Sequence, residues 1–201
     1  MDYTQMISLL QLVFTAAIAE NMSLYYFLGT CPLISVSSDL KVSFQMGLTV
    51  TFVMLISTAI NYVVYHQILV PLGIEYLQLL FFVLVIASVT QFLEQLLDRY
   101  FPEIYASFGI FLPLIAVNCA ILGVCIFVVL REYDFVSSVA YSLGSGLGWL
   151  LVICLMASLR RRIDMSCVSK YLGKTGITML TASIMALAFY GLSRIVLGNG
   201  A

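Results

Sequence analysis

Six long apolar stretches, separated by short polar connectors, constrain what this chain can fold into. A helix needs roughly 20 mainly apolar residues to cross the hydrocarbon core of a membrane, and each stretch is long enough. Charged residues make up only 9% of the 201-residue chain, whereas a soluble domain has about 25%. The sequence therefore predicts an all-α integral membrane protein with one polytopic domain over residues 1–201. The six predicted transmembrane helices cover about residues 5–30, 44–65, 74–95, 107–130, 136–159 and 176–197.

The distribution of lysine and arginine predicts how these helices are oriented. Seven of the nine basic residues lie in the first, third and fifth connectors, and the rest of the chain holds only Arg131 and Arg194. Because basic residues favour the cytoplasmic side, these three connectors are predicted to be cytoplasmic and both termini to lie on the outer side. The triplet Arg160–Arg162 is interpreted as the strongest orientation signal.

The composition and the motifs exclude several functions. A net charge of -1 offers no basic surface for nucleic acid. With His66 as its one histidine, the chain cannot supply a bis-histidine haem site by itself. It contains no phosphate-binding or dinucleotide-binding glycine motif, so no recognisable motif binds NADH. His66 and Trp149 are interpreted as residues of the membrane interface.

Two of the apolar stretches contain residues that a plain membrane helix does not need. The segment Gly109–Gly123 reads G-I-F-L-P-L-I-A-V-N-C-A-I-L-G, and Glu20–Pro32 reads E-N-M-S-L-Y-Y-F-L-G-T-C-P. Irregular backbone at membrane depth occurs only where protein buries it or where water lines it. Each stretch is therefore predicted to be a broken helix that presents a cysteine, Cys31 in the first and Cys119 in the second.

The two broken helices occupy matching places in the two halves of the chain, about residues 1–100 and 101–201. In each half a glycine-bearing helix comes next, and the third helix contains an Ala-Ser pair. Three helices per half require that such a repeat be inverted across the membrane. Inverted repeats often place discontinuous helices and functional groups at the interface between the halves.

The two cysteines are candidate metal ligands. Thiolates are soft ligands that suit iron–sulfur clusters, copper or zinc. A two-iron cluster needs four cysteines, so two thiols in this chain would form half of a site that a second subunit completes. The residues alone leave open that both cysteines merely pack in the membrane. The remaining cysteines, which have no partner in the other half, are interpreted as non-functional: Cys125, Cys154 and Cys167.

Two acidic residues are candidates for an ion pathway. Glu20 stands beside Asn21 in the first broken stretch, and Glu94 lies near the end of the third helix. Because an ionisable residue inside a membrane is costly, it usually marks an ion path or has a charged partner. For Glu94 an equal alternative is an interfacial residue in contact with cytoplasmic water.

The motifs of the two broken stretches, together with L-D-R-Y-F-P at Leu97–Pro102, resemble those of the NqrD/NqrE/RnfA/RnfE family. This family contains the six-helix membrane subunits of the sodium-pumping NADH:quinone oxidoreductase and of the related Rnf complex. The resemblance extends from about Met6 to Leu192. The block P-L-I-A-V-N-C-A is its most specific part, and E-N-M together with L-D-R-Y-F-P is most similar to the NqrE branch.

The resemblance implies a role as a subunit, inactive alone, of an enzyme that pumps sodium in the bacterial inner membrane. In the family, an NqrD-like and an NqrE-like subunit pack as an inverted pair, and each gives two cysteines to one [2Fe–2S] cluster. Cys31 and Cys119 match those ligands, and Glu94 matches an acidic position implicated in sodium handling. The cluster relays electrons between flavins, NADH and ubiquinone that other subunits bind. The implied partners are NqrD together with NqrA, NqrB, NqrC and NqrF.

Three alternatives remain at this point. One is an RnfA-type subunit, for which ferredoxin and NAD replace quinone as redox partners. The second is a secondary transporter with an inverted repeat, whose broken helices would bind a substrate without any metal. The third is a subunit with a purely structural role in assembly.

Overall fold

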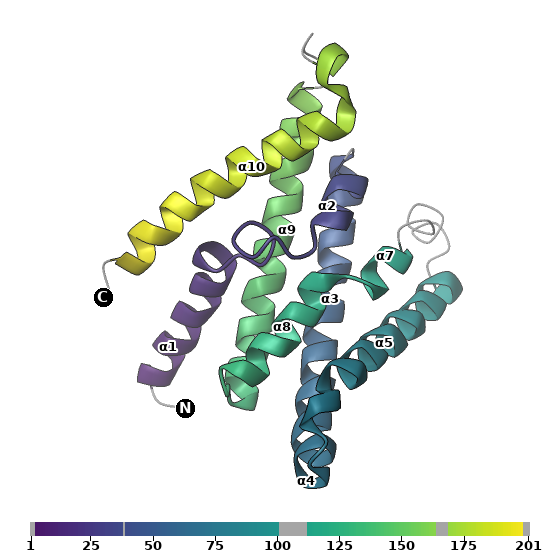
Figure 1. Ribbon diagram of the computed structural model, residues 1–201, viewed down its shortest axis with the longest axis vertical. Helices are drawn as coiled ribbons and strands as arrows, with labels where there is room; N and C mark the ends of the chain where they lie inside the picture. Colours follow the sequence, from purple (N-terminus) through teal and green to yellow (C-terminus); the bar gives the residue numbers. More distant parts are fainter. Residues whose placement is uncertain (1–2, 38, 101–111, 164–168, 199–201) are drawn as a thin grey trace.

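The computed structural model describes residues 3–37, 39–100, 112–163 and 169–198, and these residues form helices and no strands (Figure 1). Two of the elements, η1 and η2, are single π-helical turns, and η3 is a short 3₁₀ helix. In chain order the elements are α1 (Tyr3–Phe14), η1 (Thr15–Ala19), α2 (Thr30–Val36), α3 (Leu40–Val64), η2 (Tyr65–Leu69), α4 (Val70–Leu72), η3 (Glu75–Leu77), α5 (Gln78–Tyr100), α7 (Leu112–Ala116), α8 (Cys119–Leu130), α9 (Phe135–Ile163) and α10 (Ser169–Gly198).

Four helical segments are long and apolar enough to cross a membrane. Two shorter apolar segments, Met6–Ala19 and Leu114–Leu130, come from the first and fourth predicted helices. The prediction of an all-α membrane protein is therefore confirmed, and four of the six predicted helices are continuous spans. These spans are Leu40–Leu72, Gln78–Tyr100, Phe135–Ile163 and Gly176–Arg194.

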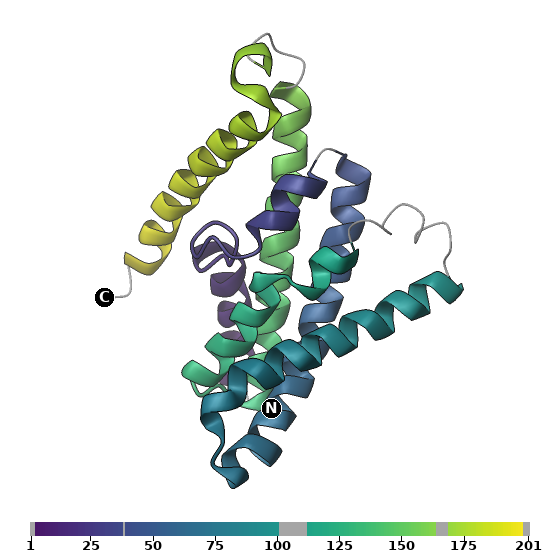
Figure 2. The same ribbon diagram turned by 45° about the vertical axis from the view of Figure 1, so that its right-hand side comes forward.

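The centre of the molecule is an antiparallel pair of long helices, α3 and α9, which lie side by side in both views (Figures 1 and 2). Glycines allow the two backbones to approach closely. A Cβ added to Gly47 of α3 would lie 2.9 Å from Cγ of Leu150, and one added to Gly146 of α9 would lie 2.7 Å from Cγ2 of Thr51. Small residues at helix crossings are the usual means of tight packing in membranes.

Both broken helices are interrupted near their cysteines, as the sequence predicts. The first is helical to Ala19, continues as irregular backbone, and resumes as α2 at Thr30. The second is interrupted between α7 and α8, at Val117 and Asn118. The predicted residues 107–111 of this stretch lie outside the described residues.

The predicted connector at His66–Gly73 is wrong, because the chain stays helical through η2 and α4 as far as Leu72. The segment between His66 and Leu72 is apolar enough to extend the span, and Leu69 within it is completely buried. Gly73, with φ of 66°, ends the helix in the left-handed conformation that glycine adopts readily.

Candidate functional site

Cys119 is the first residue of α8. Asn118 caps this helix, and its side-chain Oδ1 accepts a hydrogen bond of 3.0 Å from the backbone N–H of Ala120. The free N–H groups at a helix N-terminus carry partial positive charge, which is favourable for a negatively charged group bound there. Cys119 is half-buried and lines a cavity of about 220 Å³ that is otherwise formed by α5, α7 and α8.

The other broken helix meets Cys119 directly. The backbone N–H of Gly29 donates a hydrogen bond of 2.9 Å to Sγ of Cys119. Cys31 follows two residues later, in the first turn of α2, and two residues span at most about 7 Å along the chain. The structure therefore brings the two predicted cysteines into one region, where the side chain of Cys31 is exposed.

The segment between Ala19 and Thr30 is a compact loop that is packed into the core. Asn21 stabilises this loop through one hydrogen bond to the residues before it and one to the residues after it. Its Nδ2 donates to the carbonyl of Ala17, and its Oδ1 accepts from the backbone N–H of Ser23. Met22 is completely buried, and Leu28 lies against Gly123 of α8. This packing satisfies the requirement that irregular backbone at membrane depth be covered by protein.

Gly29 occupies a position that no other residue fits. Its φ of 75° lies in the left-handed region. An added Cβ would lie 2.8 Å from Nε1 of Trp149, 2.9 Å from Cβ of Ala120 and 2.9 Å from Oδ1 of Asn118. Glycine thus permits both the turn into α2 and the close contact with α8 and α9.

Two buried N–H donors near Gly29 have no hydrogen-bond partner among the described residues. They are Nε1 of Trp149 and Nδ2 of Asn118. A buried donor without an acceptor is costly, and a bound ligand, ion or water that supplies an acceptor is one explanation for such a group. The interpretation of Trp149 as an interface residue is wrong, because its side chain is completely buried in the core. Only the long-range packing of α9 against the first broken helix reveals its position.

The other cysteines do not join this region as far as the structure describes them. Cys125 is buried in α8 and accepts a hydrogen bond of 3.2 Å from Nδ2 of Asn61 on α3. Cys154 lies in α9, and Cys167 lies outside the described residues. Within the described ranges, no group of three or more histidine, cysteine, aspartate or glutamate side chains forms a complete metal site.

Glu20 has a charged partner. Its Oε2 lies 2.6 Å from Nη1 of Arg131, which directly follows α8. The hydrogen bond that Arg131 donates to the carboxylate of Glu20 raises the pKa of the Arg131 guanidinium above its ordinary value, although partial burial opposes this shift. Arg131 therefore stays positively charged, and Glu20 belongs to an ion pair that the sequence did not reveal.

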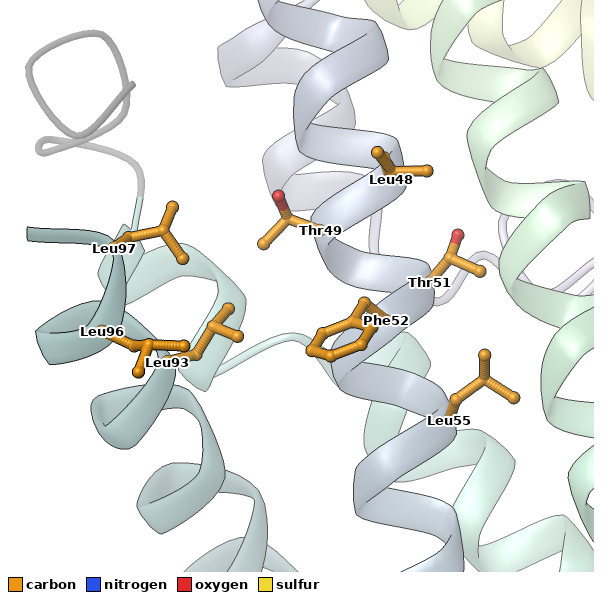
Figure 3. A pocket seen from close by; sticks show the side chains of 8 residues that line it. All are labelled: Leu48, Thr49, Thr51, Phe52, Leu55, Leu93, Leu96 and Leu97. Atoms are coloured by element: carbon orange, nitrogen blue, oxygen red, sulfur yellow. The ribbon is translucent and has the colours of Figure 1, made fainter. Parts of the chain in front are cut away.

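Glu94 lies half-exposed on α5, and no hydrogen bond or ion pair connects its carboxylate to another residue in the described part of the chain. On both sides of it along α5, leucines line an apolar groove of about 490 Å³ between α3 and α5 (Figure 3). Glu94 itself does not line this groove. The groove is lined by Leu48, Thr49, Thr51, Phe52, Leu55, Leu93, Leu96 and Leu97.

The fold and the site define a class: a multi-pass membrane protein in which two interrupted helices meet and present two free cysteines. Comparison with known proteins agrees with this class. The family described as "Rnf-Nqr subunit, membrane protein" matches residues 9–196. The chain belongs to this family.

Relatives of two kinds are similar over nearly the whole chain. The A subunit of the Na(+)-translocating ferredoxin:NAD(+) oxidoreductase complex from Acetobacterium woodii is 40% identical over 191 residues, which are 95% of this chain and 100% of the relative. The E subunit of the Na(+)-translocating NADH-quinone reductase from Psychromonas ingrahamii is 43% identical over 188 residues, or 89% of this chain and 93% of the relative. The E subunit of the same kind of reductase from Proteus mirabilis is 41% identical over 188 residues, or 90% of this chain and 95% of the relative.

Proposed function

We propose that this chain is a membrane subunit of a sodium-translocating oxidoreductase complex of the Nqr/Rnf type, and that it takes part in electron transfer across the membrane. The observation that carries this proposal is the hydrogen bond from the Gly29 N–H to Sγ of Cys119, which places the beginnings of α2 and α8 together. The relatives' names describe complexes that translocate sodium and carry out redox reactions. The chain has no catalytic site of its own in this proposal.

The residues fit half of a [2Fe–2S] site. Cys31 and Cys119 provide two thiol ligands, and such a cluster takes four. An NqrD-like partner would provide the other two, so the exposure of Cys31 is consistent with a site at an interface between two chains. When bound, the cluster would supply one-electron transfer.

The surrounding residues of this chain favour a negatively charged group. The amide N–H of Gly29 donates to Sγ of Cys119, and Cys119 is at the positive end of the 12-residue helix α8. The unpartnered donors Asn118 Nδ2 and Trp149 Nε1 lie next to Gly29. Amide and indole N–H groups directed at sulfur stabilise the more negative, reduced state of an iron–sulfur centre.

The pattern of helix packing supports two inverted repeats. The second helices of the two halves, α3 and α9, pack together in opposite directions. Each of them also packs on the broken helix of the other half, α3 on α8 and α9 on α1 and η1. The third helices do the same, since α5 packs on α7 and α8 while α10 packs on η1 and α2. With each broken helix taken as a whole, the same kinds of helix pairs therefore occur in both halves, which supports an approximate two-fold relation between them.

The same proposal assigns an orientation and a location. The start of α3, the end of α9 and the start of α10 lie at one end of the molecule, and the second and fourth connectors lie at the other (Figure 1). Lys41 and Arg160–Arg162 are at the first of these ends, so this end would face the cytoplasm. Both termini would face the outer side of the bacterial inner membrane. In this membrane the chain would assemble with NqrA, NqrB, NqrC, NqrD and NqrF or with their Rnf counterparts.

For the ion pathway, Glu94 is the stronger candidate of the two acidic residues. Its carboxylate is free of a charged partner within the described residues, whereas Glu20 is paired with Arg131. A carboxylate without a cationic partner is available to a passing sodium ion. Replacing Glu94 with glutamine is expected to weaken the sodium dependence of turnover. The control is the Asp98→Asn variant, which changes an exposed acid one turn further along α5.

Electron paramagnetic resonance of the purified, reduced complex tests the cluster. Wild type is expected to give a two-iron signal, which Cys31→Ser and Cys119→Ser remove. Cys154→Ser is the matched control, because it changes a half-buried cysteine on α9 without touching the site. A signal that survives both ligand substitutions, or a wild-type complex without one, would contradict the proposal.

Nqr-type and Rnf-type complexes are both supported, because relatives of the two kinds are nearly equally similar to this chain. The relatives' names differ in their redox partners, quinone in one and ferredoxin in the other. Reduction of the complex in membranes by NADH followed by quinone reduction would identify the first type. Electron exchange between reduced ferredoxin and NAD would identify the second type.

A further inference from the structure

Two arginines hold the two ends of the segment that carries Cys31. At one end, Nη1 of Arg131 lies 2.6 Å from the carboxylate of Glu20, and Nη2 donates a hydrogen bond of 3.4 Å to the hydroxyl of Tyr26. At the other end, Nη1 of Arg160 donates to the carbonyl of Ile34 at 2.8 Å and to Oγ of Ser37 at 3.1 Å.

Arg131 connects this segment to the helix that begins with Cys119. It follows the last residue of α8, and its guanidinium lies 5.5 Å from the ring centroids of both Phe127 and Tyr141. Its Nη1 also donates to the hydroxyl of Tyr133 at 3.2 Å. Aromatic faces and hydrogen bonds fix the guanidinium plane, so Arg131 is a rigid connection between the loop and α8.

Arg160 connects the other end of the segment to α9. The carbonyl of Ile34 is one of the last carbonyls of α2. These carbonyls have no N–H donor within the helix. A cation at a helix C-terminus satisfies these carbonyls and interacts favourably with the helix dipole. The side chains of its neighbours Arg161 and Arg162 are exposed and form no hydrogen bond with a described residue.

The segment needs such support because α2 is short. A helix of seven residues leaves most of its backbone N–H and C=O groups without partners inside the helix, so its position depends on contacts at its ends and sides. Cys31 is exposed on this helix and does not anchor it. Leu33 and Val36 bury one face of the helix in the core. The polar contacts come from Arg131, on the loop before the helix, and from Arg160, on the end of the helix.

We propose that Arg131 and Arg160 are positioning residues that set where the Cys31 thiol lies relative to Cys119. This inference rests on the proposed function, in which both thiols bind one iron–sulfur cluster. Neither arginine touches the sulfur atoms. Each acts through the Glu20–Ser37 segment, Arg131 on the approach to Cys31 and Arg160 on the end of its helix.

The test compares Arg131→Met, Arg131→Lys, Arg160→Met and Arg160→Lys in the complete complex. The matched control is Arg161→Met, which removes an adjacent arginine that makes none of these contacts. The first measurement is the intensity and shape of the two-iron signal per assembled complex. The second is the rate at which a short thiol-specific cross-linker joins Cys31 to Cys119 in membranes from iron-starved cells.

Both methionine variants are expected to slow cross-linking by about tenfold, because each variant loses charge-assisted hydrogen bonds to the segment. They are also expected to weaken and broaden the two-iron signal, and the lysine variants to recover part of both. The control should match wild type in both measurements. A lysine variant keeps the charge but not the forked geometry, so partial recovery separates positioning from a simple charge effect.

Two results would overturn the inference. One is wild-type cross-linking in both methionine variants. The other is an equal loss in Arg161→Met, which would show general destabilisation instead of positioning. If the wild-type complex has no two-iron signal but cross-linking responds as expected, the proposed cluster fails while the positioning of the two thiols by the arginines stands.

Discussion

The backbone N–H of Gly29 lies 2.9 Å from Sγ of Cys119, across 90 residues of sequence. This contact joins the two interrupted helices at the points where their second halves begin. It also depends on a glycine, because the backbone at this position is left-handed and three neighbouring side chains leave no room for a Cβ. The placement of Cys31 relative to Cys119 is therefore expected to change when a single methyl group is added at Gly29.

The Gly29→Ala substitution is expected to abolish the two-iron signal. An added Cβ would lie 2.8 Å from Nε1 of Trp149 and 2.9 Å from Cβ of Ala120, so the loop must move away from Cys119. Electron paramagnetic resonance of the reduced complex measures this. Gly73→Ala is the control, because its φ of +66° carries the same conformational cost of about 1–2 kcal/mol while nothing lies within 4 Å. Equal effects of both substitutions would show that strain alone is responsible.

The Trp149→Phe substitution is expected to lower the midpoint potential of the cluster. It removes the buried indole N–H beside Gly29 but keeps an aromatic ring in the core. Loss of one donor disfavours the more negative, reduced state, so the midpoint potential falls. A hydrogen bond of about 1 kcal/mol corresponds to a shift in midpoint potential of about 40 mV for one electron. A redox titration followed by electron paramagnetic resonance measures the shift.

Tyr141→Phe is the matched control for this titration. It removes another buried polar hydrogen on α9 that has no partner among the described residues, but at a position packed near Arg131. Its potential should equal that of wild type. If Trp149→Phe leaves the potential unchanged, the indole N–H does not face the cluster.

The sequence was sufficient to predict the helical membrane class and the two interruptions near Cys31 and Cys119. These features follow from local properties: apolar length, and proline, asparagine and glycine within apolar runs. The end of the second span was predicted too early, at about residue 65, because His66 and Gln67 interrupt the apolar pattern without breaking the helix.

The supports of the site could not be predicted, because they depend on contacts between distant parts of the chain. Trp149 has the character of an interfacial residue in the sequence, and only the packing of α9 against Gly29 reveals that it is buried. The partner of Glu20 is 111 residues away, at Arg131. Arg160 cannot be distinguished from Arg161 and Arg162 in the sequence, yet among these three only Arg160 is hydrogen-bonded to α2.

The Gly148→Ala substitution is expected to destabilise the packing between the two halves. An added Cβ would lie 2.5 Å from the carbonyl oxygen of Ala17 and 2.9 Å from Nδ2 of Asn21. Backbone cannot move aside as a flexible side chain can, and overpacking of this kind costs about 1–3 kcal/mol. The yield and thermal stability of the solubilised complex should both fall. Gly191→Ala on α10, where nothing lies within 4 Å, should have little effect.

Cys125 is expected to matter for stability and not for the cluster. Its buried thiol accepts a hydrogen bond from Nδ2 of Asn61 and contacts the hydroxyl of Thr58 at 3.9 Å. Cys125→Ala leaves the Asn61 amide without an acceptor, which costs about 1–3 kcal/mol for a buried polar group. Cys125→Ser restores an acceptor of similar size and should recover most of this loss.

Thermal unfolding of the solubilised complex and the two-iron signal together test the role of Cys125. Both variants should keep the signal, and only Cys125→Ala should unfold at a clearly lower temperature. Loss of the signal in Cys125→Ser, at normal stability, would instead make Cys125 a ligand. In that case the hydrogen bond from Asn61 would describe the thiol only in the absence of iron, and the assignment of half a site to Cys31 and Cys119 would have to change.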